Sequence, residues 1–341
     1  MKVARLYNFN DIRIEDMPVP SLGPCDALIK TMACGICSGD VMPWYIEKKA
    51  PLVIGHEPSG EVVEVGRHVT SFKKGDRVFT HHHAPCFACR FCRRGDYVQC
   101  LTWKNSQIVP GGIAEYILIP SVNLEHDTIA LSEKISFEDG TLIEPAACVV
   151  KGLKRSGIRR GDTVLVIGLG VMGMINILIA KEYGAGMVIG ADMVKFRLDK
   201  ALESGADFII DVSEKDLGVA IKEVTDGEMA ELVIAGPNSV DVMMAGIECV
   251  RPGGQVLFFT PARPGEKLIL DPNYLYFSDI NIITSYSCGP ADTADAYELI
   301  EKGVISSDKL ITHRFPIEKT ADAFRLTYRA ENSLKSIITF D

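Results

Sequence analysis

A glycine-rich turn at residues 168–173 constrains the fold of this chain more than any other feature. The turn reads Gly-Leu-Gly-Val-Met-Gly, follows the apolar segment TVLVI and opens a helical stretch. From Thr163 to Ser287, short strand-like apolar segments alternate with helical segments. This alternation predicts right-handed βαβ units and an α/β Rossmann domain with a doubly wound parallel sheet.

In this setting the turn indicates a dinucleotide site. Its first glycine permits the turn, its second lets the backbone approach a pyrophosphate, and its third lets the helix pack on the strand. Asp192 ends the next strand-like segment and can accept hydrogen bonds from ribose hydroxyls, whereas it would repel a 2′-phosphate, so NAD is expected rather than NADP. Arg197 could cover the adenine or ribose, or could equally be a solvated helix residue. The expected cofactor-binding residues are Gly168, Leu169, Gly170, Val171, Met172, Gly173, Asp192 and Arg197.

Four of the ten cysteines form one tight run, Cys86-x2-Cys89-x2-Cys92-x7-Cys100, within a polar, arginine-rich loop. Four thiolates at this spacing predict a closed tetrahedral zinc site of the structural kind. An iron–sulfur cluster is disfavoured because its bacterial motif closes with three intervening residues, not seven. The more scattered Cys25, Cys148, Cys249 and Cys288 are predicted to be small core fillers.

Composition excludes several classes of protein. The 341 residues carry a net charge of −9, so nucleic acid is not an expected partner. No apolar stretch reaches the ~18 residues needed to span a bilayer, and the N-terminus lacks a long apolar core, so we expect a cytoplasmic chain without membrane contact.

The first 120 residues read as short apolar runs broken by Gly and Pro, which predicts a compact, mainly-β domain. The tail after Ser287 reads as two helices and a final strand, and we expect it to return to that domain. The predicted domains are therefore a catalytic domain of residues 1–149 and 288–341, and a dinucleotide-binding domain of residues 150–287.

Candidate catalytic residues lie in the first domain. Cys37 lies in a Gly-flanked turn after an apolar strand, His56 and Glu57 follow a short apolar run, and Glu144 precedes the βαβ region. One Cys, one His and a carboxylate brought together would form an open zinc site, with the fourth position left for water or an alcohol substrate.

Together these motifs resemble the zinc-dependent medium-chain dehydrogenase/reductase superfamily. The resemblance is carried in order by G-H-E-x-x-G-x-V-x-x-V-G at residues 55–66, G-D-R-V at 75–78, the four-cysteine loop, Glu144-Pro145 and the glycine turn. It implies a GroES-like catalytic domain, with Cys37 and His56 as zinc ligands and Glu57 and Glu144 alternately binding the metal or holding its water. It also implies two zinc ions per subunit, one catalytic and one structural, and a homo-oligomer, either a tetramer or a dimer.

Within the superfamily, the chain resembles the polyol and L-threonine dehydrogenases. Glu144-Pro145 favours a polyol, sugar or cyclitol oxidised by NAD at a secondary alcohol, whereas Thr312-His313-Arg314-Phe315 resembles threonine dehydrogenases. An L-threonine or 2,3-butanediol dehydrogenase is therefore the enzyme alternative.

The chain departs from the family pattern at the proton relay. Relatives carry Ser or Thr two residues after the catalytic Cys and often His five after it, but here these positions are Gly39 and Met42. We expect Glu144 or a histidine of the run 81–83 to serve instead, with His83 preferred; alternatively, the three histidines are solvated or packing residues. The missing relay residues also motivate a second alternative, a non-catalytic NAD-binding regulatory protein.

Overall fold

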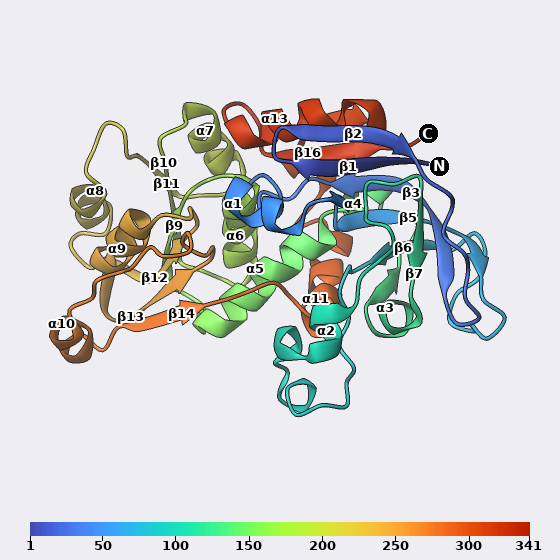
Figure 1. The fold of residues 1–341 in the computed structure, drawn as a ribbon. Helices are drawn as coiled ribbons and strands as arrows, with labels where there is room; N and C mark the ends of the chain where they lie inside the picture. The colour runs from blue at the N-terminus through green and yellow to red at the C-terminus, as the bar shows by residue number, and fades with distance from the viewer. The chain divides into compact units, whose positions relative to one another are not determined.

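Residues Cys148–Ser287 form one unit of the molecule, and Met1–Ala147 forms the other together with Cys288–Asp341. The computed structural model describes residues 1–341, and Figure 1 shows its helices and strands in chain order. Each unit has its own buried apolar clusters and is described by itself below.

The Cys148–Ser287 unit contains one sheet of six parallel strands in the order β11-β10-β9-β12-β13-β14. The strands are β9 (Thr163–Ile167), β10 (Met187–Asp192), β11 (Phe208–Asp211), β12 (Ala230–Ala235), β13 (Val250–Phe258) and β14 (Asn281–Thr284). The chain passes from β9 to β10 and β11 on one side and then to β12 on the other. This reversal of order confirms the predicted doubly wound sheet.

Helices connect these strands: α6 (Val171–Glu182), α7 (Lys195–Glu203), α8 (Leu217–Val224), α9 (Val240–Glu248) and α10 (Pro272–Phe277). The central strands β9 and β12 are almost continuously apolar, and Val164, Leu165 and Val233 are fully buried. Strands of this composition are typical of a parallel sheet that is covered on both faces.

The other unit is mainly β, as predicted for the catalytic domain. Its larger sheet has the order β15-β16-β3-β5-β6-β8, with β7 also paired to β3, and a smaller sheet has the order β2-β1-β4. The strands are β1 (Lys2–Asn8), β2 (Asp11–Asp16), β3 (Ala27–Gly35), β4 (Leu52–Val53), β5 (Glu57–Val65), β6 (Arg77–Thr80), β7 (Tyr116–Ile119), β8 (Thr128–Ala130), β15 (Ile311–Pro316) and β16 (Lys335–Thr339).

The C-terminal tail completes this unit. Strand β16 pairs antiparallel with β3, so the tail shares a sheet with the first part of the chain. The α-helices of this unit are α1 (Pro43–Ile46), α2 (Leu101–Asn105), α3 (Ser121–His126), α4 (Phe137–Gly140), α11 (Pro290–Glu301), α12 (Ser307–Leu310) and α13 (Thr320–Arg329). Helix α5 (Ile143–Ser156) begins in this unit and continues into the other. No helix combines the length and apolar character required to span a bilayer.

One sequence prediction about the cysteines is wrong. Cys249 and Cys288 are buried and Cys148 is partly buried, but Cys25 is exposed. Cys25 lies in the turn that precedes β3, and this turn places it at the surface, so it does not fill the core.

Candidate active site and metal-binding loop

The structure brings Cys37, His56 and Glu57 together. Their candidate ligand atoms all lie within 4.8 Å of one another. Strand register explains the arrangement, because β3 and β5 run antiparallel with Gly35 opposite Glu57, so the turn after β3 lies beside the start of β5. The Oε1 atom of Glu57 is buried without a hydrogen-bond partner, as expected for an atom that faces a metal ion. A thiol, an imidazole and a carboxylate are the ligand types that zinc prefers, so this site fits zinc.

Asp40 supports His56, a contact that the sequence analysis missed. Its buried Oδ2 lies 3.2 Å from Nδ1 of His56. The distance is that of an ion pair, and it occupies one ring nitrogen of His56 while it leaves the other nitrogen available to a metal. The only sequence signal for this contact was the acidic residue at the end of the Cys37 turn.

Lys335 lies behind Glu57 and was also missed. Its ammonium group forms an ion pair with Oε2 of Glu57, and each side chain is only 1% exposed. The same group donates to the Ile36 carbonyl at 3.0 Å. Burial alone would lower the pKa of Lys335, but the charges of Glu57 and Cys37 raise it above its usual value, so the lysine stays protonated. Gly35 makes room for the pair, because a Cβ there would lie 1.9 Å from Oε2 of Glu57.

Glu144 belongs to a neighbouring group. It lies in the first turn of α5, and its carboxylate and the rings of His81 and His82 offer ligand atoms within 4.8 Å of one another. The rings of His82 and His56 have centroids 4.8 Å apart, so the two groups adjoin. Burial, followed by the charges of nearby His81 and His56, holds the pKa of His82 well below its usual value, so His82 is neutral.

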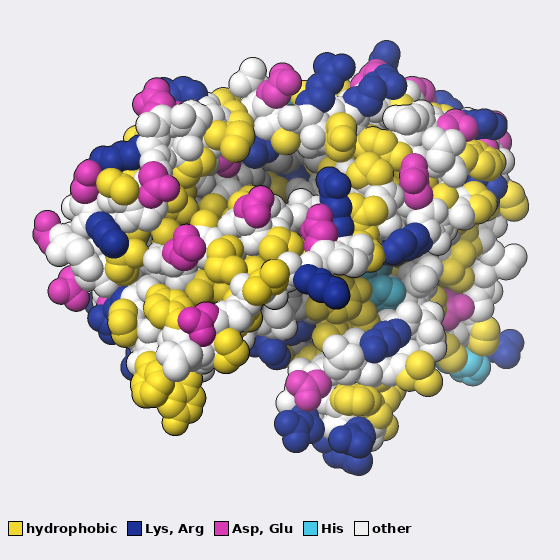
Figure 2. All heavy atoms as spheres, turned by 60° about the vertical axis from the view of Figure 1, so that its left-hand side comes forward, with side chains coloured by type: hydrophobic (Ala, Val, Ile, Leu, Met, Phe, Trp, Pro, Cys, Tyr) yellow, Lys and Arg dark blue, Asp and Glu magenta, His cyan; other side chains and the backbone are white.

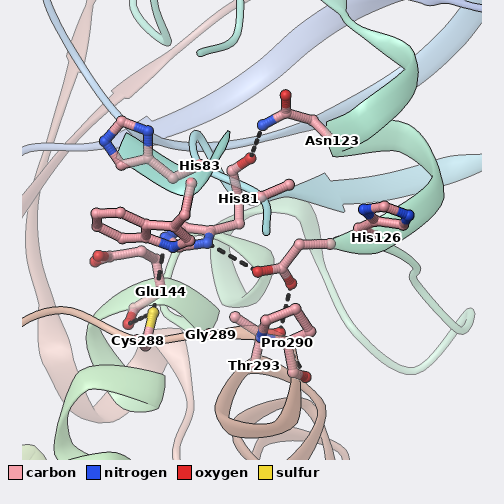
Figure 3. Close-up of polar contacts among 12 residues, drawn as sticks. His81, His83, Asn123, His126, Glu144, Cys288, Gly289, Pro290 and Thr293 are labelled. Carbon is pink, nitrogen blue, oxygen red and sulfur yellow. Dashed lines mark hydrogen bonds and ion pairs between the residues drawn. The ribbon is translucent and has the colours of Figure 1, made fainter. Parts of the chain in front are cut away.

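His81 is the centre of a buried polar network (Figure 3). Its Nδ1 donates to Asp127 at 2.8 Å, and Asp127 also accepts from the Thr293 hydroxyl at 2.6 Å. The Cys288 thiol lies 3.7 Å from Nε2 of His81, and the Asn123 amide donates to the His81 carbonyl at 3.0 Å. Although burial lowers the pKa of His81, Cys288 and Asp127 raise it well above its usual value. The network joins the end of β6 to α3 and to the start of α11.

His83, the preferred relay residue, has different contacts. Its Nδ1 donates to the Ser106 carbonyl at 2.5 Å, and its ring lies 4.3 Å from the buried Trp103 ring, centroid to centroid. Burial lowers the pKa of His83 to about 4. These contacts favour the packing interpretation of His83, whereas His82 is the member of the run nearest to His56.

The four cysteines of the loop at residues 86–100 also converge. Their sulfur atoms lie within 4.8 Å of one another, with separations of 3.5 Å for Cys89 and Cys92, 3.6 Å for Cys86 and Cys100, and 4.0 Å for Cys86 and Cys92. Tetrahedral zinc with Zn–S bonds of ~2.3 Å requires sulfur atoms about 3.8 Å apart. None of the four is in a disulfide, so the loop fits a zinc ion closed on all sides by thiolates.

The glycine turn in the other unit has the geometry of a dinucleotide site. Gly168 has a φ of +88°, and a Cβ at Gly173 would lie 2.2 Å from the Gly168 carbonyl oxygen. Helix α6 starts directly after Gly170, so the unpaired N–H groups of its first turn, which contains Val171 and Met172, can bind phosphate.

Asp192 and Arg197 lie at this turn. Asp192 accepts from the Leu169 N–H at 2.7 Å, and Arg197 lies 3.7 Å from the same carboxylate oxygen. The Arg197 side chain is only 17% exposed, which argues against a merely solvated helix residue.

Family models and known proteins agree with this geometry. Residues 23–126 match the alcohol dehydrogenase GroES-like domain, and residues 171–302 match the zinc-binding dehydrogenase domain. The chain is 33% identical over 348 residues to the sorbitol dehydrogenase of Bombyx mori, with 95% of this chain and 94% of the relative covered. It is 32% identical over 324 residues to the D-arabitol-phosphate dehydrogenase of Enterococcus avium, with 93% and 90% covered.

The fold is also similar to that of a solved structure, a short chain alcohol dehydrogenase from E. coli CFT073 in complex with NADH. The two chains superpose with a TM-score of 0.89 at 26% sequence identity, and the superposition covers 100% of this chain and 99% of the other. The chain is therefore an oxidoreductase of the zinc-dependent medium-chain dehydrogenase/reductase superfamily, within its polyol dehydrogenase branch.

Proposed function

We propose that this protein oxidises a secondary alcohol of a polyol, sugar or cyclitol to a ketone, with NAD as the hydride acceptor. The observation that carries the proposal is the convergence of Cys37, His56 and Glu57 within 4.8 Å. The relatives named for sorbitol and D-arabitol phosphate support a polyol as the substrate class.

In this proposal Cys37 and His56 hold the catalytic zinc, and Glu57 or Glu144 supplies the carboxylate. When bound, zinc supplies Lewis acidity toward an alcohol oxygen, and NAD supplies the acceptor for the hydride. Asp40 fixes the orientation of His56, and Lys335 balances the buried charge of Glu57. Three protein ligands leave one tetrahedral position for the substrate alcohol.

The glycine turn binds the pyrophosphate, and Asp192 selects NAD. The first-turn N–H groups of α6 provide donors to phosphate oxygens. Asp192 is held at the turn by the Leu169 N–H, so its negative charge is fixed where a 2′-phosphate would approach. Arg197 completes this site beside Asp192.

The loop formed by Cys86, Cys89, Cys92 and Cys100 holds a second zinc ion, which is structural. Its four sulfur ligands leave no position for a substrate. The metal stabilises the fold of a polar loop, because the apolar core of this loop contains few residues besides Trp103.

We further propose that the protein is a cytoplasmic homo-oligomer, either a dimer or a tetramer. None of the ten cysteines forms a disulfide, which suits a reducing compartment. Strand β14 ends the parallel sheet, and nearby Ile269, Tyr276 and Phe277 are 83%, 79% and 78% exposed. Figure 2 shows a hydrophobic group protruding at the lower edge of the face that includes α10. An open strand edge and exposed apolar side chains favour association, which light scattering would measure.

The decisive experiment is a panel of initial rates with zinc-loaded protein and either NAD or NADP. The panel contains sorbitol, xylitol, galactitol and their phosphates, inositols, L-threonine and 2,3-butanediol. We expect turnover of a polyol or its phosphate with NAD, abolished in Cys37→Ser and retained in Cys25→Ser, because Cys25 is an exposed thiol outside the site. Preferential turnover of L-threonine or butanediol would replace the polyol assignment, and NAD binding without any turnover would favour the regulatory alternative.

A further inference from the structure

Within the histidine run 81–83, only the middle ring lacks a partner for its Nδ1. His81 donates through Nδ1 to Asp127, and His83 donates through Nδ1 to Ser106. The Nδ1 atom of His82 is buried with no hydrogen-bond partner. Several other buried side-chain atoms also lack a hydrogen-bond partner, but that of His82 is distinguished by its place beside His56 and Glu144.

The location of His82 shows where that ligand would be. Its ring lies 4.8 Å from that of His56, and its ligand atom lies within 4.8 Å of the Glu144 carboxylate. His82 therefore lies beside the proposed catalytic metal ligands. An imidazole at this place offers two ring nitrogens for hydrogen bonds.

The other residues near Cys37 provide little polar capacity. Gly39 has no side chain, although a Cβ built there would lie only 3.4 Å from the Cys37 sulfur, and Met42 offers only a weak thioether acceptor. A substrate alcohol bound next to Cys37 and His56 would therefore meet neither a hydroxyl nor an imidazole at positions 39 and 42, and Ser38, the one hydroxyl residue of this turn, is exposed. The neighbouring carbon of a polyol carries a second hydroxyl, which also requires a partner once water is excluded.

We propose that His82 hydrogen-bonds the hydroxyl adjacent to the reacting carbinol and so makes the enzyme select vicinal diols over isolated secondary alcohols. This inference rests on the proposed function. Cys37, His56 and one carboxylate already account for three protein ligands of an open zinc site, so the imidazole of His82 remains available to the substrate.

The test compares two substrates in each protein variant: the best polyol of the panel, and cyclohexanol, which has one secondary hydroxyl and no neighbour. His82→Leu removes both hydrogen-bonding nitrogens, and we expect kcat/KM for the polyol to fall roughly 10- to 100-fold relative to that for cyclohexanol. His82→Gln keeps a donor and an acceptor, so it should recover much of the ratio. His83→Leu is the matched control: because His83 contacts Ser106 and Trp103, any loss should be equal for both substrates.

A measurement independent of turnover separates substrate binding from metal binding. In protein loaded with Co²⁺ and without substrate, the visible spectrum of His82→Leu should match that of the wild type. When polyol is added, the wild-type spectrum should change at a lower polyol concentration than the spectrum of the variant. An altered spectrum without substrate would make His82 a metal ligand and overturn the proposal. Equal losses for both substrates would also overturn it while leaving the proposed function standing. Wild-type protein that oxidises no polyol would instead refute the proposed function, and this inference with it.

Discussion

Replacement of Lys335 by Met should destabilise the unit that contains the proposed active site by about 3–5 kcal/mol, the usual cost of breaking a buried ion pair from one side. Lys335 and Glu57 are each 1% exposed, so water cannot replace the lost ammonium group. The change also removes the donor to the Ile36 carbonyl. Since methionine matches much of the lysine stem in volume, the cost arises mainly from the unpaired charge of Glu57 and not from a cavity.

Tryptophan fluorescence isolates this effect. Trp44 and Trp103 are the only two tryptophans, and both belong to the Met1–Ala147 part of the chain, so guanidinium unfolding followed by fluorescence reports on this unit. All variants should be compared without added zinc and in the same concentration of chelator, because bound metal stabilises the folded state and Glu57 is itself a candidate ligand.

Two further variants make the prediction specific. The double variant Glu57→Gln with Lys335→Met removes both charges and should recover most of the lost free energy of unfolding. Lys302→Met is the matched control, because Lys302 pairs with Glu298 on the surface, where both side chains are at least 60% exposed, and should cost little. A Lys335→Met protein within about 1 kcal/mol of the wild type, or a double variant no more stable than the single one, would refute the argument.

Three other changes test separate parts of the structure. Cys92→Ser removes one of the four sulfur ligands of the cysteine loop. Mass spectrometry should then show one zinc ion fewer per subunit, and an unchanged zinc content would contradict a metal site there. Gly173→Ala places a Cβ 2.2 Å from the Gly168 carbonyl oxygen, so α6 must shift. The affinity for NAD, measured by calorimetry, should fall roughly tenfold or more. An unchanged affinity would contradict close packing at the turn. Burial raises the pKa of Cys249 to about 12, so this thiol should stay unreactive toward a disulfide reagent at pH 8 in the native protein. The exposed Cys25 should react quickly, and the fast phase of labelling should disappear in Cys25→Ser. Rapid labelling of Cys249 would contradict the prediction.

Features encoded by short segments could be predicted from the sequence. The parallel sheet followed from apolar segments that alternate with helices, and the glycine turn and the four-cysteine loop each lie within a few consecutive turns of chain. The pairing of Lys335 with Glu57 could not be predicted in this way, because 278 residues separate them and neither belongs to a motif that names the other. The pairing of β16 with β3 places the strand that carries Lys335 beside the end of β3, next to the proposed active site.

The histidine run shows why a motif can indicate a site but not the residue that acts there. Strand β6 ends at Thr80, so strand alternation no longer fixes which way the next side chains point. Asp127 and Thr293, from distant parts of the chain, hold His81 in place, and Ser106 holds His83. These partners occupy the outer two rings and leave the Nδ1 of His82 free beside His56. The distinction between His82 and His83 therefore depends on three long-range contacts, which the local sequence does not reveal. For this reason the sequence favoured His83 as the histidine that acts at the site, whereas the structure favours its neighbour His82.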